Sequence, residues 1–237
     1  MTLPVAVLAG GLGTRVRHRT GPLLPKALLP VAGVPFIDLK LRELRAGGAA
    51  RVVLLVGHGG SELEEHVGDG AAYGLELQVL HDPPELLGTG GALRRAVPEL
   101  GPEFIVTYGD TLLEVPMDRL AELLVSSSAG AVMTVLRNDD RWETSNVDVA
   151  DGYVTAYEKP AMRGHHRFLD YGMLAMRATA LDAVALQPPF DLADVLRALV
   201  SRREVRALQV TRRFYDIGNE ASFVETERFI RRQGRSG

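Results

Sequence analysis

Short apolar runs alternate with helical patterns along the first half of the chain. The runs that we predict as buried strands lie at residues 3–9, 51–56, 75–79, 104–108 and 131–136. Helices are predicted between them at residues 36–46, from Ser61 onward, at 89–97 and at 117–124. Ser61 and Glu64 have the spacing of a capping box, which predicts that the second helix begins there. This alternation predicts βαβ units and a mainly parallel sheet.

The second half of the chain has a different pattern. Asp151 and Gly152 separate two short alternating runs, at 147–149 and 153–157, and this predicts a β-hairpin whose turn lies at Asp-Gly. Further strands are predicted at 168–176, 204–210 and 214–217, and helices at 191–200 and 219–232. We therefore expect one α/β domain over residues 1–237. Its Rossmann-like, mainly parallel mixed sheet would be flanked by helices, with a smaller antiparallel portion in the second half.

Composition narrows the class of protein without selecting a function. Hydrophobic residues make up 46% of the chain and charged residues 24%, which is typical of a soluble globular protein. A net charge of −3 and a pI near 6.1 do not indicate a nucleic-acid-binding surface. We therefore expect no binding to nucleic acid. The absence of cysteine excludes disulfides and thiolate zinc sites. Because no apolar run has the length of a signal peptide or a membrane span, we also expect a cytoplasmic protein that does not bind a membrane.

The first strand leads into a glycine-rich turn that is followed by two cations. Gly10, Gly11 and Gly13 come after the strand, and Arg15 and Lys26 follow in a loop that contains prolines. Glycines let backbone N–H groups approach phosphate oxygens, and the cations compensate the negative charge, so the pattern predicts a triphosphate site. The turn is neither a dinucleotide fingerprint, which needs a third glycine, nor a Walker loop. For the glycines alone, an ordinary strand-to-helix turn remains open.

Together with Lys26 and its neighbouring prolines, this turn resembles the signature of the sugar-1-phosphate nucleotidyltransferases, also called NDP-sugar pyrophosphorylases. That signature is Gly-Gly-x-Gly-Thr-Arg, then Pro-Lys, then a Pro-Val or Pro-Met turn. Matching stretches follow in order at residues 10–15, 25–31, 87–92, 108–110, 158–160 and 215–218. The stretch at 87–92 is most similar to guanylyltransferases that act on heptose or mannose 1-phosphates.

The resemblance implies an enzyme that transfers a nucleoside monophosphate from an NTP to a sugar 1-phosphate and releases pyrophosphate. It favours GTP and a heptose or hexose phosphate, and it leaves UTP, dTTP and CTP open. It also implies a GT-A-like fold with an NTP-binding part at about residues 1–135 and a sugar-phosphate-binding part at about 136–237. A homo-oligomer is open as well, because no stretch of the sequence identifies an interface.

Three residues carry the implied catalysis: Arg15, Lys26 and Asp110. Arg15 would hold the departing pyrophosphate, and Lys26 the phosphates near the reacting centre. Asp110 and Asp216 would hold Mg²⁺, a cation that binds carboxylates together with phosphate oxygens. The attacking phosphate oxygen is already anionic, so no general base is expected.

The same motifs imply the binding residues. Those for the nucleotide are Leu8, Ala9, Gly10, Gly11, Gly13, Thr14, Arg15, Gly88, Thr89 and Gly90. Those for the sugar phosphate are Gly109, Asn146, Glu158, Lys159, Tyr171 and Gly172. Lys159 would bind the phosphate of the incoming sugar. For residues 88–91, a helix entry without a ligand remains open.

The sequence departs from the family pattern at two places. Arg17 and Arg19 make the loop after the glycine turn more basic, either as extra phosphate contacts or as surface charge. Residues 170–172 read Asp-Tyr-Gly where relatives often have Asn-Ala-Gly, which leaves the identity of the sugar open. His165 and His166 are predicted in an exposed loop without a role, because no carboxylate cluster accompanies them in the sequence.

Two other functions remain open at this point. One is a cytidylyltransferase for a non-sugar alcohol phosphate such as phosphocholine, which would need an aromatic cage. Aromatic residues make up only 6% of the chain, which disfavours it. The other is a non-catalytic, nucleotide-sugar-binding regulatory homologue, which would be expected to lose a metal ligand or a phosphate cation.

Overall fold

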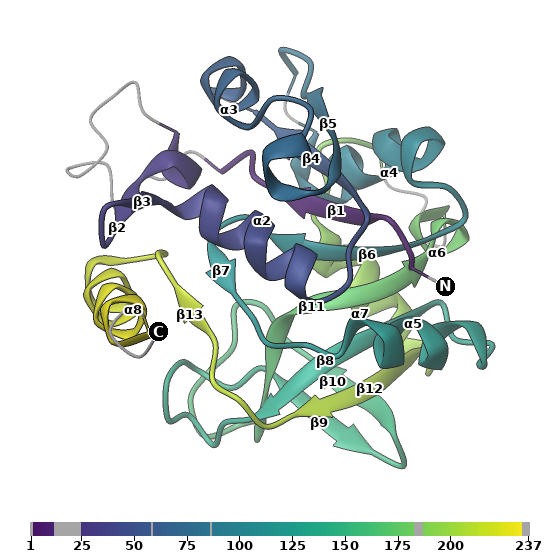
Figure 1. The fold of residues 1–237 in the computed structure, drawn as a ribbon. Coiled ribbons are helices and arrows are strands. Elements are labelled where there is room, and N and C mark those ends of the chain that lie inside the picture. The colour runs from purple at the N-terminus through teal and green to yellow at the C-terminus, as the bar shows by residue number, and fades with distance from the viewer. Residues whose placement is uncertain (1, 12–24, 58, 86, 183–186, 234–237) are drawn as a thin grey trace.

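One large sheet forms the centre of the computed structural model, which describes residues 2–11, 25–57, 59–85, 87–182 and 187–233 (Figure 1). In these residues nine strands pair in the order β5–β4–β1–β6–β11–β8–β12–β10–β9. The strands of the first half are β1 (Val5–Leu8), β4 (Arg51–Val56), β5 (Glu76–His81), β6 (Glu103–Tyr108) and β8 (Ala131–Arg137). Those of the second half are β9 (Val147–Ala150), β10 (Tyr153–Tyr157), β11 (Phe168–Arg177) and β12 (Val205–Val210). The predicted mixed sheet is confirmed, although its strand pairs are not mainly parallel: four are parallel and five are antiparallel.

The strand order reverses at β1. β1 pairs in parallel with β4 on one side and with β6 on the other, and β5 continues the sheet beyond β4. Ligands in open α/β sheets bind where the strand order reverses, beyond the carboxyl ends of the strands. Gly10 follows β1 and Asp110 follows β6, so both lie at this position.

The second half extends the same sheet. β11 lies antiparallel between β6 and β8, and β12 is parallel to β8. The predicted hairpin of β9 and β10 is confirmed, with Asp151 and Gly152 at positive φ values of 53° and 75° in its turn. Phe168 of β11 also pairs with Val147 of β9, so the pairings among β11, β8, β12, β10 and β9 close into a ring. The antiparallel portion is thus joined to the main sheet.

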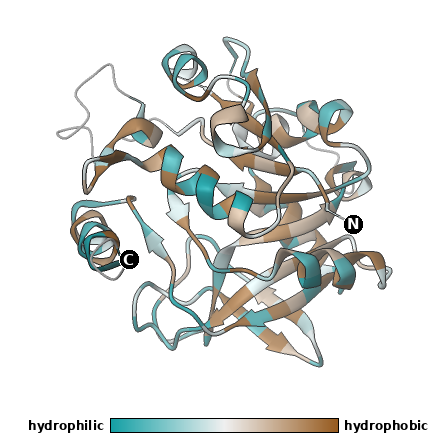
Figure 2. Cartoon of the chain, viewed as in Figure 1, coloured by the Kyte–Doolittle hydropathy of each residue, from teal (hydrophilic) through white to brown (hydrophobic). Residues whose placement is uncertain are grey.

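Helices cover both faces of the sheet (Figures 1 and 2). α2 (Phe36–Ala46), α3 (Gly60–Val67) and α5 (Met117–Val125) share one apolar cluster with Val5 and Val7 of β1. α4 (Gly88–Leu100), α6 (Ala178–Asp182) and α7 (Leu192–Ser201) share the cluster on the other face with Ala6. Successive strand residues point to opposite faces, so a strand buried on both sides is apolar throughout.

A smaller apolar cluster joins the C-terminal helix to the rest of the molecule. α8 (Glu220–Gln233) packs through Phe223 against Phe36 and Leu112. The same cluster contains Val31 of the short β2 (Pro30–Val31), which pairs with β3 (Val34–Pro35). Two further short strands, β7 (Thr111–Leu112) and β13 (Tyr215–Asp216), pair antiparallel, and β13 lies next to α8. This pairing joins the segment after Asp110 to the segment that contains Asp216.

Two local predictions were wrong in detail. α3 begins at Gly60 rather than at Ser61, its N-cap is Gly59 in the left-handed region, and no side-chain cap bond forms. Glu64 does not close a capping box; it contacts His81 on β5 at 2.7 Å. The strand predicted at 214–217 is reduced to the two residues of β13.

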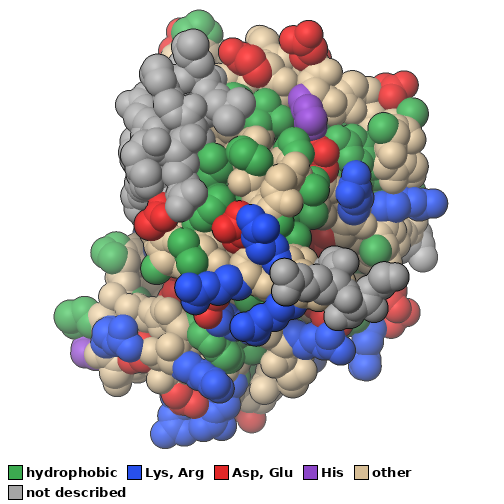
Figure 3. All heavy atoms as spheres, turned by 60° about the vertical axis from the view of Figure 1, so that its left-hand side comes forward, with side chains coloured by type: hydrophobic (Ala, Val, Ile, Leu, Met, Phe, Trp, Pro, Cys, Tyr) green, Lys and Arg blue, Asp and Glu red, His purple; other side chains and the backbone are tan. Residues whose placement is uncertain are grey.

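The surface carries both signs of charge. Figure 3 shows Lys and Arg side chains gathered across the middle and lower part of one face, with Asp and Glu side chains among them. Mixed charge of this kind agrees with a net charge of only −3. Within the residues that the structure describes, no helix combines the length and apolar character needed to cross a membrane.

Candidate active site

Two adjoining pockets lie at the carboxyl ends of β1 and β6. The first, which we call the glycine pocket, has a volume of about 290 Å³. Its lining comprises Leu8, Ala9, Gly10, Gly11, Lys26, Ala27, Leu55, Asp82, Leu87, Gly88, Thr89, Ala92, Tyr108, Gly109, Asp110 and Asp191. The second, the acidic pocket, has a volume of about 470 Å³. Its lining comprises Tyr108, Asp110, Thr111, Glu143, Thr144, Asn146, Glu158, Lys159, Ala161, Leu169, Asp170, Tyr171, Gly172, Phe214, Asp216 and Gly218. Tyr108 and Asp110 belong to both, so the two pockets meet at these side chains.

The glycine turn after β1 packs against a neighbouring stretch of backbone. A Cβ atom on Gly10 would lie 3.2 Å from the backbone nitrogen of Gly57, whereas nothing lies within 4 Å of a Cβ on Gly11. Gly10 is therefore small because a second chain segment lies against it, and Gly11 leaves open space in the pocket. Gly13, Thr14 and Arg15 lie outside the described residues.

The glycines at the start of α4 are explained mainly by packing. Gly88 has a φ of +71°, and a Cβ there would lie 2.3 Å from the carbonyl oxygen of Phe190. A Cβ on Gly90 would lie 2.5 Å from the ring of Phe190. The Gly90 N–H donates to the Phe190 carbonyl at 3.0 Å. Gly88 and Thr89 line the glycine pocket, whereas Gly90 faces Phe190.

Lys26 and Asp110 form the central ion pair of the site. Lys26 begins the 3-10 helix η2 (Lys26–Leu28), and its Nζ donates to Asp110 Oδ2 at 2.6 Å. The Lys26 side chain is 14% exposed and that of Asp110 is 39% exposed. The second Asp110 oxygen, Oδ1, accepts a bond from Thr111 Oγ1 at 3.1 Å. The cation thus lies where the two pockets meet.

Asp216 is brought beside Asp110 by the pairing of β7 with β13. Asp216 is opposite Thr111 in this pair, and the Ile217 N–H donates to the Asp110 carbonyl at 3.0 Å. Asp216 Oδ1 accepts bonds from the Gly218 N–H and from Ser222 Oγ, both at 2.7 Å, which fixes the carboxylate at the start of α8. Both carboxylates line the acidic pocket.

These two carboxylates suit a hard divalent cation. Magnesium in phosphate-transfer sites binds one or two carboxylates and completes its shell with phosphate oxygens and water. Within the described residues, no group of three or more histidine or acidic side chains converges as a metal site. A cation held by Asp110 and Asp216 would therefore need substrate oxygens. The donor set fits magnesium on this ground.

The acidic pocket contains Lys159 and several carboxylates. Lys159 Nζ lies 5.6 Å from the centroid of the Tyr108 ring. Burial raises the pKa of Asp170, and the charge of Lys159 acts in the opposite direction. Burial also raises the pKa of the Tyr108 hydroxyl, with the charges of Asp170 and Asp110 adding to it. The pocket wall thus disfavours additional negative charge.

Asn146 and Glu158 join β9, β10 and β11 at one wall of this pocket. The Asn146 side-chain oxygen accepts the N–H of Asp170 at 2.9 Å, and the Asn146 carbonyl accepts the N–H of Glu158 at the same distance. Asn146 is 9% exposed. Its side-chain amide binds the backbone of β11 and also lines the pocket. This network places Asp170, Glu158 and Lys159 together.

Tyr171 and Gly172 occupy the middle of β11. Tyr171 is 1% exposed, its ring packs edge-on against Phe214 with centroids 6.2 Å apart, and its hydroxyl accepts the Glu114 N–H at 3.3 Å. Burial raises the pKa of this hydroxyl to about 12. Gly172 has a φ of +95°, and its N–H donates to Asp170 Oδ1 at 3.1 Å. The Tyr171 hydroxyl is thus engaged with Glu114, whereas the turn at Gly172 holds the Asp170 carboxylate.

Most of the residues expected from sequence lie in the two pockets. Gly109, expected in the sugar-phosphate site, lines the glycine pocket instead. Its N–H donates to the Leu8 carbonyl at 3.0 Å, which keeps β6 close to β1. The motifs did not indicate Asp82, Asp191 or Glu143 as lining residues, and Tyr108, which belongs to the matching stretch 108–110, was given no role. Asp82 follows the carboxyl end of β5, so the position of that strand in a parallel sheet was the signal that could have indicated it.

The expectation of an exposed, unpaired histidine loop was wrong for His166. Its ring Nδ1 lies 2.8 Å from Asp148 Oδ2, and its Nε2 lies 3.3 Å from Glu158 Oε2. His166 is 8% exposed, whereas His165 is exposed. Carboxylates distant along the sequence are brought to the ring by β9 and the end of β10, so spacing alone could not show them.

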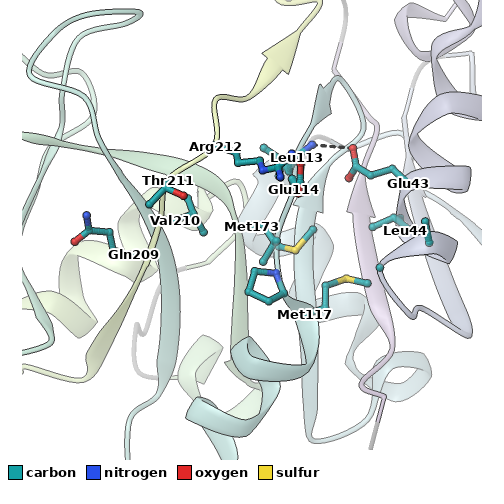
Figure 4. Close-up of a pocket in the computed structure, with 14 residues that line it drawn as sticks. Glu43, Leu44, Leu113, Glu114, Met117, Met173, Gln209, Val210, Thr211 and Arg212 are labelled. Carbon is teal, nitrogen blue, oxygen red and sulfur yellow. Dashed lines mark hydrogen bonds and ion pairs between the residues drawn. The ribbon is translucent and has the colours of Figure 1, made fainter. Parts of the chain in front are cut away.

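A third pocket, of about 580 Å³, is drawn in Figure 4 and shares no lining residue with the first two. Glu43 of α2 points to Leu113, whose N–H donates to it at 2.7 Å, and Met117 and Met173 lie below this pair. Glu43 also binds Lys40, which is fully buried, at 2.9 Å. None of the described residues that line this pocket belongs to the set expected from the motifs. Volume alone would therefore have pointed away from the glycine turn.

The fold and the site together define the class of this protein. A glycine turn at the reversal point of a parallel sheet, with a cation and a carboxylate beside it, is typical of nucleotide-binding α/β proteins. The model of the MobA-like NTP transferase domain matches residues 5–208, so the chain belongs to this family.

Similar proteins agree with this assignment. The chain is 28% identical to the N-acetylmuramate alpha-1-phosphate uridylyltransferase of Neisseria meningitidis serogroup B, over 93% of this chain and 95% of that protein. It is 26% identical to the D-glycero-alpha-D-manno-heptose 1-phosphate guanylyltransferase of Campylobacter jejuni, over 90% and 93% of the two chains.

Two solved structures establish the fold. A putative glucose-1-phosphate thymidylyltransferase from Bacillus anthracis superposes with a TM-score of 0.82 at 18% identity, over 98% of this chain and 96% of that one. HddC from Yersinia pseudotuberculosis, complexed with GMP-PN, gives a TM-score of 0.77 at 22% identity, over 96% and 100%. The predicted nucleotidyltransferase fold is confirmed.

Proposed function

We propose that this protein transfers a nucleoside monophosphate from an NTP to a sugar 1-phosphate and releases pyrophosphate. The observation that carries the proposal is the junction of the two pockets at Tyr108 and Asp110. The glycine pocket has the backbone and the cation that suit a nucleotide, and the acidic pocket has Lys159 for a second phosphate. Both relatives described above are named for transfer to a sugar 1-phosphate.

The reaction needs two polyanions in line, so the main demands are positioning and charge neutralisation. A phosphate oxygen of the sugar 1-phosphate forms a bond to the α-phosphorus of the NTP. The bond from this phosphorus to the oxygen that bridges it to the β-phosphorus breaks, and both electrons leave with pyrophosphate. Lys159 would hold the attacking phosphate, Lys26 the α-phosphate region, and Arg15 the departing pyrophosphate. The attacking oxygen is already anionic, so no side chain has to remove a proton.

Asp110 and Asp216 would hold magnesium in this site. When bound, the ion supplies positive charge to phosphate oxygens and helps to orient them. The chain prepares the position by fixing Asp216 through the Gly218 N–H and Ser222 Oγ. The Lys26 ammonium lies 2.6 Å from the Asp110 carboxylate, and this ion pair offsets the cost of placing the carboxylate in a partly buried position.

We further propose GTP as the nucleotide. A guanine edge offers imino and amino N–H donors, and Asp82 and Asp191 are carboxylate acceptors in the glycine pocket. Burial raises the pKa of Asp82, which makes a hydrogen-bonding partner favourable there. The heptose relative from Campylobacter jejuni is named a guanylyltransferase, and this supports the same choice.

The test is a matrix of GTP, UTP, dTTP and CTP against a panel of sugar 1-phosphates, with pyrophosphate release as the readout. We expect turnover with sugar 1-phosphates, fastest with GTP, and dependence on added Mg²⁺. Phosphocholine serves as the acceptor control and should give no product. Absence of pyrophosphate release in every combination would refute the catalytic proposal, whereas faster turnover with another NTP would refute only the choice of GTP.

A further inference from the structure

The acidic pocket holds more carboxylates than the proposed chemistry uses. Lys159 is the one Lys or Arg among the described residues that line it. In the proposed function this cation binds the sugar phosphate, and Asp110 and Asp216 are assigned to magnesium. Three carboxylates remain on the wall: Glu143, Glu158 and Asp170. They have no role in binding phosphate, because like charges repel.

Asp170 is the most firmly held of these carboxylates. Its Oδ1 accepts the Gly172 N–H at 3.1 Å, and its Oδ2 lies 3.4 Å from the donating hydroxyl of Tyr157. Its own N–H donates to Asn146 Oδ1. These partners lie immediately before β9, in β10 and in β11, so the carboxylate keeps its place in the pocket wall.

Glu158 is held at the same wall from behind. Its N–H donates to the Asn146 carbonyl at 2.9 Å, and its Oε2 lies 3.3 Å from His166 Nε2. Glu158 immediately precedes Lys159, so the phosphate cation and this carboxylate come from one turn of chain. A sugar whose phosphate lies at Lys159 would thus place its ring among fixed oxygen acceptors.

The chemistry of these acceptors discriminates between sugars. Hydroxyl and amide N–H groups donate to carboxylates, whereas a sugar carboxylate would bring a like charge against them.

We propose that the acidic pocket selects neutral polyhydroxy sugar 1-phosphates and rejects sugars that carry a carboxylate, with Asp170 as the main discriminating side chain. This inference rests on the proposed function. It separates the chain from the relative named for N-acetylmuramate, a sugar with a lactyl carboxylate, and places it with the relative named for a neutral heptose.

The test uses product pairs that share base and ring and differ at C6, where one member has a hydroxymethyl group and the other a carboxylate. These pairs are UDP-glucose with UDP-glucuronate and GDP-mannose with GDP-mannuronate, each titrated by calorimetry. We expect the neutral member to bind at least about tenfold more tightly in each pair that binds. Equal or tighter binding of the acidic member would overturn the proposal.

Asp170→Asn keeps an oxygen that can accept the Gly172 N–H and removes the charge. The neutral-to-acidic affinity ratio should fall about fivefold or more in this variant. Asp151→Asn, at the exposed hairpin turn, is the matched control and should leave the ratio unchanged. A ratio that stays the same in Asp170→Asn would exclude Asp170 as the discriminating residue.

A second measurement needs no variant. Salt screens repulsion between charges, so raising NaCl from about 50 to 500 mM should narrow the ratio in the native protein. A salt-independent ratio would contradict the electrostatic origin. A different result would refute the proposed function itself: no nucleotide sugar binds, and no sugar 1-phosphate gives pyrophosphate release.

Discussion

The glycine pocket is walled largely by backbone and small residues, whereas the acidic pocket is walled by charged side chains on a network of strands. In the first, Gly10 and Gly88 are small because other chain segments lie against them. In the second, Asn146 and Gly172 hold Asp170 by hydrogen bonds. Substitutions in the glycine pocket should therefore disturb folding, and those in the acidic pocket should change selectivity.

The junction of the pockets should be the most sensitive position for activity. Lys26→Ala removes the cation that lies 2.6 Å from Asp110, and kcat/KM for pyrophosphate release should fall on the order of 10³-fold. Arg212→Ala is the matched control, because Arg212 pairs with Glu114 at the exposed surface and lines neither pocket. An unchanged kcat/KM in Lys26→Ala would remove Lys26 from the mechanism.

Asp216→Asn should have the next largest effect on activity. The asparagine keeps an oxygen for the Gly218 N–H and Ser222 Oγ, so α8 stays in place while the charge is lost. We expect kcat/KM to fall on the order of 10²-fold and the half-saturating Mg²⁺ concentration to rise. Steady-state assays over a magnesium titration measure both. The assignment of Asp216 to the metal fails if the magnesium dependence of the variant matches that of the native enzyme.

Gly88→Ala tests the claim that the glycine pocket is set by packing. The alanine would carry a positive φ and press against the Phe190 carbonyl, so the free energy of unfolding should fall by about 3 kcal/mol. Gly74→Ala has a similar φ of +69° in the left-handed region, and its Cβ would approach only the flexible side chain of Arg45, at 3.3 Å, so it should cost only about 1 kcal/mol. Urea denaturation of both variants isolates the clash; equal losses would show that Phe190 imposes no constraint.

His166 gives the smallest expected effect, and it depends on pH. Burial alone would lower the His166 pKa, but Asp148 and Glu158 outweigh it and the pKa is raised above 6.5. A raised pKa stabilises the folded protein at low pH, and this contribution is lost as the pH rises through the folded value. The native protein should therefore exceed His166→Gln in Tm by more at pH 5.5 than at pH 8.5. His165→Gln, at the exposed neighbour, should show no such change; a pH-independent difference for His166→Gln would contradict the ion pairs.

The sequence could predict the features that depend on local patterns, but not those that depend on contacts with distant residues. Apolar runs predicted the strands of the sheet because burial on both faces requires continuous hydrophobic residues, and Asp-Gly predicted the hairpin turn. The capping box at Ser61 failed because Gly59 adopts the cap conformation and Glu64 pairs with His81. A local sequence pattern could not indicate that Glu64 pairs with His81, because His81 lies on the strand β5.

The sequence alone predicted a phosphate site at the glycine turn with Arg15 and Lys26, and the resemblance to the sugar-1-phosphate nucleotidyltransferases implied the roles of Asp110, Lys159 and Asp216. Tertiary structure alone decided that Asp110 belongs to both pockets and that the β7–β13 pairing brings Asp216 to it. It also decided that Asp170 stands among carboxylates and that His166 is buried between two. Side chains from separate strands meet only when the sheet forms. The electrostatic interactions among them, and with these the proposed selection of the sugar, therefore depend on the fold.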